Sequence, residues 1–324
     1  MNHLQQYLVD EFVEDYQEGL ISRRQALKKI AGITGLVVAT QLLAACGDPA
    51  KPATATSAPN PTTAPTATTA VATESTPTTA STGGSVPNSV AENDPAIKAA
   101  MVEFAGGDGQ LMAYLAQPVG DGAFPVVLVC HENRGLTPHI QDVARRVAKA
   151  GYVGLALDLL SREGGTASIT DADSVPGLLS GAPPERHVAD FKAGVEYLKT
   201  QAFADTSKIG MVGFCFGGGV TWLVAAGMPE LKAAVPFYGP PVPSSEIPKI
   251  NAPVLAIYAE EDDRITSTVA EVEAAMQQNN KVYRKEIYPG VNHAFHNDTG
   301  QRYNAEAAQA AWAETLAWFK QYLV

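Results

Sequence analysis

The feature that most limits the fold of this chain is a repeated alternation of strands and helices after about residue 97. The turn 106–109 splits residues 98–118 into two short strands. Further strands are predicted at 125–131, 152–159, 209–214, 233–238, 253–258 and 282–288. Helical periodicity is found at 139–150, 184–200, 217–226, 267–279 and 304–322. Mostly apolar strands separated by helices are typical of a parallel sheet covered on both faces, so we expect an α/β fold.

The composition limits the range of partners. The chain has 324 residues, of which 46% are hydrophobic, enough for one large core or two small ones. Its formal net charge is -11, and no run rich in Lys and Arg occurs outside the first thirty residues. We therefore expect no nucleic-acid partner. Three cysteines are too few for a disulfide framework, so each needs its own explanation.

Residues 1–46 are predicted to be an export signal that ends in a lipobox. The pair Arg23–Arg24 precedes an apolar run, 30–45, that is too short for a comfortable transmembrane helix. The run ends in Leu-Ala-Ala-Cys46, which resembles a bacterial lipobox whose cysteine is acylated. We expect an exported protein that is anchored to the outer face of the membrane through Cys46. Ala26 stands where a twin-arginine signal usually has a large apolar residue, so the general secretory route stays open as well.

Residues 47–96 are predicted to be a disordered tether. The segment is rich in Pro, Thr, Ala and Ser and has almost no large apolar side chains. Such a composition cannot bury enough surface to offset the entropy cost of ordering the chain. The catalytic domain is therefore placed at residues 97–324.

The sequence Gly213-Phe-Cys-Phe-Gly217 lies where a predicted strand meets a predicted helix. It has the pattern of a nucleophile elbow, with Cys215 in the position of the usual serine. Glycines at both flanks suit a tight turn, and the helix N-terminus stabilises a thiolate and a developing oxyanion. Most free cysteines are small buried apolar residues, and Cys130, inside an apolar strand, fits that description. We predict that Cys215 is the nucleophile.

The acid and the base of a triad follow the nucleophile in this fold. Asp262 lies just after the strand 253–258 and is predicted to be the acid, although Asp263 and other carboxylates lie in the same loop. His293 follows the last strand and is predicted to be the base that takes the thiol proton. His296 is the local competitor and is expected at the surface.

These motifs resemble the dienelactone hydrolase family over residues 97–322, and they include the sequence His131-Glu-Asn-Arg-Gly135. The resemblance implies an α/β-hydrolase fold and the hydrolysis of a lactone or carboxylic ester without a cofactor. It also implies that Glu132 contacts the resting thiol and helps to deprotonate it. The alternative is that Glu132 has no catalytic role and its carboxylate forms an ion pair with Arg134. The implied oxyanion hole consists of the backbone N–H groups of Phe216 and Asn133.

The sequence determines the substrate less well than it determines the catalytic residues. Members of that family that act on small carboxylated lactones bind the carboxylate with arginines, one of them four residues after the catalytic histidine, where this chain has Asn297. We predict a small-molecule pocket near Tyr238, Trp222 and Arg186, with part of the segment 161–184. Two alternatives stay open: a broader esterase or thioesterase acting on cell-envelope substrates, and an inert binding protein tethered at the surface. No metal site is predicted, because the histidines are scattered along the sequence.

Overall fold

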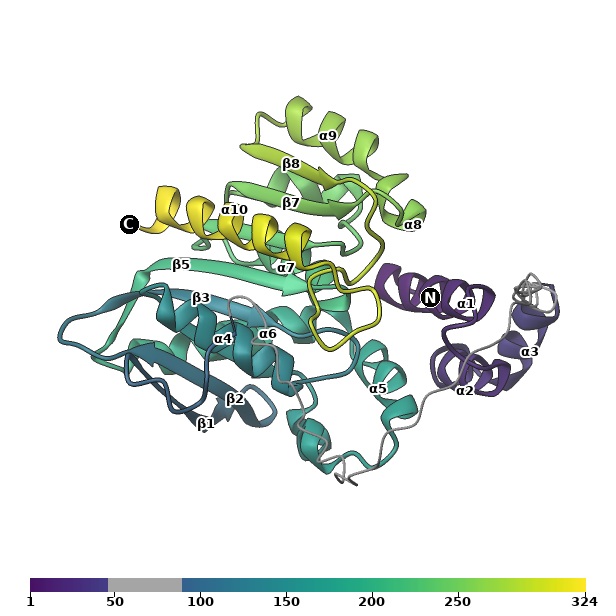
Figure 1. Cartoon of the computed structure of the whole chain (residues 1–324), viewed down its shortest axis with the longest axis horizontal. Helices are drawn as coiled ribbons and strands as arrows, with labels where there is room; N and C mark the ends of the chain where they lie inside the picture. The colour runs from purple at the N-terminus through teal and green to yellow at the C-terminus, as the bar shows by residue number, and fades with distance from the viewer. Residues whose placement is uncertain (46–88) are drawn as a thin grey trace, which may run out of the picture.

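The computed structural model describes residues 1–45 and 89–324, and its centre is one eight-stranded sheet (Figure 1). The sheet order is β1-β2-β4-β3-β5-β6-β7-β8. The strands are β1 (Ile97–Gly106), β2 (Gly109–Pro118), β3 (Phe124–Cys130), β4 (Val153–Asp158), β5 (Ala204–Phe214), β6 (Ala233–Phe237), β7 (Val254–Ala259) and β8 (Tyr283–Tyr288). Strands β1 and β2 form an antiparallel hairpin, β2 pairs antiparallel with β4, and all other neighbours are parallel. The predicted α/β class is confirmed.

Helices cover both faces of the sheet. The helices after residue 88 are α4 (Pro138–Lys149), α5 (Val175–Gly181), α6 (Pro184–Lys199), α7 (Phe216–Gly227), α8 (Asp263–Thr266), α9 (Val269–Gln278) and α10 (Ala305–Leu323), and α5 packs on α1 (His3–Gln17) and α2 (Arg23–Thr34) rather than on the sheet. In Figure 1, α4 and α10 lie in front of the sheet, whereas α6 and α7 contact each other behind it. Because both faces are covered, the central strands are fully buried; every residue from Val126 to Cys130 has no exposed surface.

Two segments differ from the sequence-based expectation. The stretch 161–184, for which the sequence predicts neither a helix nor a strand, contains three short 3-10 turns and α5. Residues 89–96 belong to the folded domain, because the backbone of Val90 binds two side chains of α4. Its N–H donates to Asp142 at 2.8 Å and its C=O accepts from Arg145 at 2.6 Å. Residues 89–96 of the predicted tether 47–96 are therefore folded, and the rest of that segment and Cys46 lie outside the described residues.

Residues 1–45 form α1 (His3–Gln17), α2 (Arg23–Thr34) and α3 (Leu36–Ala45). A capping box of Asn2 and Gln5 begins α1, and one of Ser22 and Gln25 begins α2. Figure 1 shows α1, in purple, at the edge of the sheet where the parallel strands end. The prediction of an export signal does not anticipate that α1 contacts the catalytic domain. In the described parts of the chain, no helix combines the length and apolarity that crossing a membrane requires.

Candidate active site

Cys215 stands at the bend between β5 and α7. Its backbone has φ 58° and ψ -122°, a conformation that side-chain-bearing residues seldom adopt. The backbone N–H of Cys215 donates to the C=O of Phe237 at 3.1 Å, which ties the bend to the neighbouring strand. A strained residue held in this way at a strand-to-helix turn is the expected geometry of a nucleophile elbow.

The flanking glycines allow the backbone to approach closely at this bend. A Cβ atom on Gly213 would lie 2.1 Å from the carbonyl oxygen of Gly217. A Cβ atom on Gly217 would lie 2.4 Å from the carbonyl oxygen of His131. Both contacts are with backbone atoms that cannot move away, so the two positions require glycine, as the motif indicates.

Asp262 and His293 come together from loops that follow β7 and β8. The Nδ1 atom of His293 lies 2.6 Å from Oδ2 of Asp262, and both side chains are buried. Burial opposes a charged imidazole, but the Asp262 carboxylate raises the pKa of His293 above its usual value. Burial likewise acts to raise the pKa of Asp262, and His293 overcomes this and lowers it. The neighbouring Asp263 begins α8 instead.

The competing histidine, His296, is placed differently from the prediction. It is only 1% exposed, so the expectation of a surface residue is wrong. Its ring stacks on Phe214 with centroids 4.9 Å apart and also contacts Trp312. Burial in this aromatic cluster lowers its pKa well below the usual value. His296 therefore acts as a neutral core residue behind the site.

The thiol of Cys215 contacts side chains that the sequence analysis did not identify. The hydroxyl of Tyr7 in α1 lies 3.3 Å from the Cys215 sulfur and 3.1 Å from Nε2 of His293. A carboxylate oxygen of Glu11, one turn further along α1, lies 3.5 Å from the same sulfur. Burial raises the pKa of the Cys215 thiol well above its usual value, and the charges of Glu11 and Glu132 raise it further. The thiol is therefore protonated in this arrangement.

Glu132 is buried near the thiol, but its hydrogen bond is with another residue. Its Oε2 accepts from the side-chain amide of Asn297 at 2.5 Å. Among the described residues, no ion pair joins it to Arg134, and the acidic side chain in hydrogen-bond contact with the sulfur is Glu11. Asn297 thus provides a neutral amide to Glu132 at the position where the resemblance leads one to expect an arginine.

The two predicted oxyanion-hole residues, Phe216 and Asn133, both lie near Cys215. Phe216 is the first residue of α7, and its backbone N–H opposes the burial effect by lowering the pKa of Cys215. Asn133 follows β3, lines the same cavity as Cys215, and donates its side-chain amide to Glu11 at 2.8 Å. Their part in binding an oxyanion stays a prediction.

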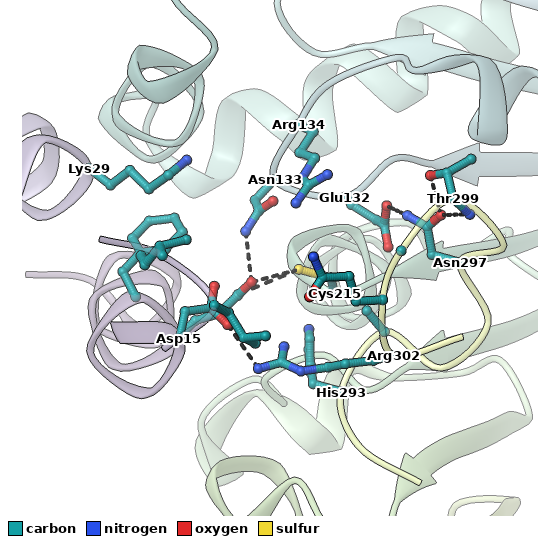
Figure 2. A pocket seen from close by; sticks show the side chains of 17 residues that line it. Asp15, Lys29, Glu132, Asn133, Arg134, Cys215, His293, Asn297, Thr299 and Arg302 are labelled. Atoms are coloured by element: carbon teal, nitrogen blue, oxygen red, sulfur yellow. Dashed lines mark hydrogen bonds and ion pairs between the residues drawn. The ribbon is translucent and has the colours of Figure 1, made fainter. Parts of the chain in front are cut away.

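A cavity of about 260 Å³ opens beside Cys215 between α1, α2 and the catalytic domain. Figure 2 shows Cys215 and His293 facing this cavity, with Asp15 and Lys29 on the opposite wall. The wall on the catalytic domain contains polar residues from two loops: Glu132, Asn133, Arg134, Asn297, Thr299 and Arg302. The cavity is thus lined on one side by residues that precede the predicted tether.

The three predicted pocket residues do not line this cavity. Tyr238 is fully buried. The centroid of its ring lies 4.9 Å from that of the His293 ring, so Tyr238 packs against the imidazole. Trp222 is 1% exposed within α7, with Tyr283 as a ring neighbour. Arg186, at the start of α6, pairs with Glu163 at 3.5 Å. Arg186 and Trp222 lie on α6 and α7, which pack behind the sheet, and Tyr238 follows β6 and packs against His293.

One group of possible metal ligands exists in the described parts of the chain. The sulfur of Cys215, a ring nitrogen of His293 and a carboxylate oxygen of Glu11 lie within 4.8 Å of one another. These ligand types suit zinc, although the Tyr7 hydroxyl already contacts both the sulfur and the imidazole. Sequence spacing could not reveal this group, because its members come from three distant elements.

Comparison with known proteins gives a consistent result. A family model described as the dienelactone hydrolase family matches residues 111–323. A Methylorubrum extorquens protein, assigned by inference as a carboxymethylenebutenolidase, is 38% identical over 227 residues, which cover 66% of this chain and 78% of that one. A similarly assigned Escherichia coli K12 protein is 35% identical, with 71% and 89% covered. The crystal structure of a Klebsiella pneumoniae protein, assigned by inference as a dienelactone hydrolase, has a TM-score of 0.66 and 33% identity, with 70% of this chain and 100% of that one covered.

Proposed function

This chain belongs to the dienelactone hydrolase family, and we propose that it hydrolyses a lactone or carboxylic ester with Cys215 as nucleophile, His293 as base and Asp262 as the residue that orients His293. The proposal depends most on one observation, which is that three features lie together at the ends of the parallel strands. The elbow thiol, a histidine hydrogen-bonded to a buried carboxylate, and a polar cavity meet there. A nucleophile, a base and a group that orients the base are the components of a hydrolytic triad.

The reaction begins when the thiol proton of Cys215 passes to Nε2 of His293. Nδ1 of His293 donates to Asp262, which fixes the tautomer and stabilises the imidazolium that forms. The sulfur then attacks the carbonyl carbon, and the C–O bond to the leaving alcohol breaks as His293 returns a proton to that oxygen. Water, deprotonated by His293, cleaves the thioester and regenerates the thiol.

The carbonyl oxygen gains negative charge in this step. We assign its stabilisation to the backbone N–H of Phe216, at the N-terminus of α7, and to that of Asn133. Glu132 has a different role, because a carboxylate near the thiol favours the protonated form. By this effect it keeps the resting thiol protonated, whereas the family resemblance implies that it helps to deprotonate the thiol.

The proposed substrate class is supported by the residues of the cavity wall. Arg134 and Arg302 provide positive charge on the catalytic domain, whereas Asn297 provides a neutral amide beside Glu132. A small ester or lactone fits these residues without an arginine four positions after His293. A broader esterase or thioesterase activity on cell-envelope esters is the second candidate, and export of the protein would favour it.

The location is part of the same proposal: the protein is exported and anchored through a lipid on Cys46. Arg23 and Arg24 are exposed at the start of α2. In α3, the apolar side chains of Leu36 and Val37 are 63% and 70% exposed. A basic pair followed by accessible apolar residues suits recognition by an export system.

The decisive experiment is a screen of p-nitrophenyl esters, thioesters and lactones with the full chain and with a chain that begins at residue 89. We expect at least one ester or lactone to be cleaved, and Cys215→Ala to abolish the reaction. Mass spectrometry under rapid quench should trap an acyl group on Cys215. Equal activity in Cys215→Ala would refute the nucleophile assignment, and inactivity towards every substrate class would favour an inert binding protein.

A further inference from the structure

We propose that α1 is an intramolecular inhibitor that closes the active site, and that the hydrolase becomes active when residues 1–45 leave it. The inference concerns the regulation of the proposed Cys215 site and rests on that proposed function. Its basis is geometric. Helix α1 inserts two side chains, Tyr7 and Glu11, between the solvent and the reacting atoms.

The hydroxyl of Tyr7 occupies the space beside the Cys215 sulfur that the carbonyl group of a substrate must enter. This hydroxyl lies 3.3 Å from the Cys215 sulfur and 3.1 Å from Nε2 of His293, so it stands between the nucleophile and its base. A substrate carbonyl must approach the sulfur to about 3–3.5 Å. With α1 in place, Cys215 is only 3% exposed and His293 only 1% exposed. The closed arrangement therefore excludes the attack.

Glu11 directs the thiol proton away from the base. The Cys215 thiol donates to the Glu11 carboxylate, while the hydroxyl of Tyr7 donates to the sulfur. Glu11 is 6% exposed and lies on the otherwise apolar inner face of α1. A buried carboxylate is costly unless it is hydrogen-bonded, and here Asn133 and Cys215 provide the donors. This face of α1 is therefore complementary to the active site itself.

Ion pairs hold α1 at the mouth of the site. Residues 1–22 contain no lysine or arginine, and α1 presents acidic side chains to arginines of the catalytic domain. Glu14 pairs with Arg264 at 2.5 Å, and Asp15 pairs with Arg302 at 2.9 Å. The guanidinium of Arg264 also lies over the ring of Tyr7, 5.4 Å from its centroid. Arg264 lies in α8, which begins directly after Asp262. Arg302 lies in the loop that contains His293, so each pair joins α1 to a segment next to a residue of the proposed triad.

Helix α2 provides a second attachment. Gly32 of α2 and Gly177 of α5 approach so closely that a Cβ on Gly177 would lie 2.9 Å from the Gly32 carbonyl oxygen. Lys29 pairs with Asp173 at 3.2 Å beside this contact. The inhibitory segment therefore docks through two helices. Cleavage before Cys46, as the predicted lipobox requires, would separate both helices from the hydrolase and connect export to activation.

The test compares a closed chain with two opened forms, all in a Cys46→Ala background. One opened form carries Glu14→Arg and Asp15→Arg, which place positive charges opposite Arg264 and Arg302. The other carries a sequence-specific protease site within residues 50–85 and is cut. The matched control, Glu103→Arg with Glu230→Arg, makes the same charge change at exposed sites away from α1. The readouts are the rate of iodoacetamide labelling at Cys215, followed by peptide mass spectrometry, and ester hydrolysis.

We expect both opened forms to label at Cys215 at least about tenfold faster than the parent and the control, with a parallel gain in hydrolysis, since apparent reactivity scales with the open fraction. Equal labelling rates in parent and opened forms would overturn the inference. So would a loss of hydrolysis on opening, because α1 would then be part of the working site. Faster labelling without hydrolysis of any substrate would uphold the closure by α1 and count against the proposed function alone.

Discussion

The side-chain amide of Asn297 donates a 2.5 Å hydrogen bond to the carboxylate of Glu132, deep in the site. This bond satisfies the carboxylate without neutralising it, because an amide carries no charge. The negative charge of Glu132 therefore still acts on Cys215 and contributes to the raised pKa of the thiol, after burial and Glu11. Glu132 thus acts on Cys215 through its charge, and its hydrogen bond goes to Asn297.

Removing that charge should make the thiol easier to ionise. In a chain that begins at residue 89, we expect Glu132→Gln to lower the pKa of Cys215, because the negative charge of Glu132 raises it. The pH dependence of iodoacetamide labelling measures this shift. Glu230→Gln, at an exposed position, is the control and should leave the profile unchanged. An unshifted profile in Glu132→Gln would show that the carboxylate does not act on the sulfur.

We expect Asp262→Asn to lower the catalytic activity because it changes the hydrogen-bond partner of His293. The amide cannot stabilise the imidazolium or fix its tautomer, so kcat should fall by about 10²–10⁴-fold with a small change in KM. The carboxylate raises the pKa of His293, so its loss lowers that pKa and moves the acid limb of the residual pH profile to lower pH. Asp263→Asn removes the adjacent loop carboxylate and should retain parental kinetics. Equal losses in both variants would mean that the loop, and not the pairing with His293, matters.

Acid should destabilise the protein through His187. Burial lowers the pKa of this histidine to about 3, against about 6.5 in an unfolded chain. The unfolded state therefore takes up a proton below pH 6.5 that the folded state does not. The stability that neutral His187 contributes is complete above pH 6.5 and is lost as the pH falls towards 3, at up to about 1.4 kcal/mol per pH unit.

His187→Leu should remove the part of the pH dependence of the free energy of unfolding that comes from His187. Urea unfolding at pH 7 and pH 5 gives the loss of stability for each protein, and the loss should be roughly 2 kcal/mol smaller in the variant. Comparing each protein with itself cancels any change in packing that the substitution causes. An identical loss in the two proteins would place the acid sensitivity elsewhere, with His296 as the next candidate, since burial lowers its pKa in the same direction.

Much of the fold and the placement of Cys215, Asp262 and His293 could be predicted because the signals are local. The strand-to-helix elbow needs glycines within two residues of Cys215, and the mostly apolar strands mark the parallel sheet. The pocket could not be predicted in this way. Tyr238 follows a strand, as a pocket residue would, but its φ of 35° and its ring contacts place it behind His293. Its orientation depends on packing that no sequence window contains.

The contact between Tyr7 and Cys215 joins residues 208 positions apart, which explains why sequence patterns did not reveal it. Residues near the N-terminus have the apolar periodicity of any amphipathic helix, and the basic pair that follows directs attention to export. The one unusual local feature is Glu11 on the buried face of α1. An acidic residue on an apolar helix face indicates a polar partner, but the partner becomes visible only in the folded chain.

The elbow itself can be tested by adding single methyl groups. Gly217→Ala would place a Cβ 2.4 Å from one backbone oxygen and 2.6 Å from another, and neither can move without shifting β3. Gly227→Ala would meet the side chain of Val188, whose nearest methyl group would lie at 2.8 Å, and Gly107→Ala would meet no atom within 4 Å. Overpacking costs typically 1–3 kcal/mol and sometimes more, so we expect Tm to fall by about 6–10 °C for Gly217, less for Gly227 and not at all for Gly107. Scanning calorimetry gives the order of the three; a Gly217→Ala protein as stable as the parent would mean that the bend at Cys215 is not held by its backbone contacts with β3.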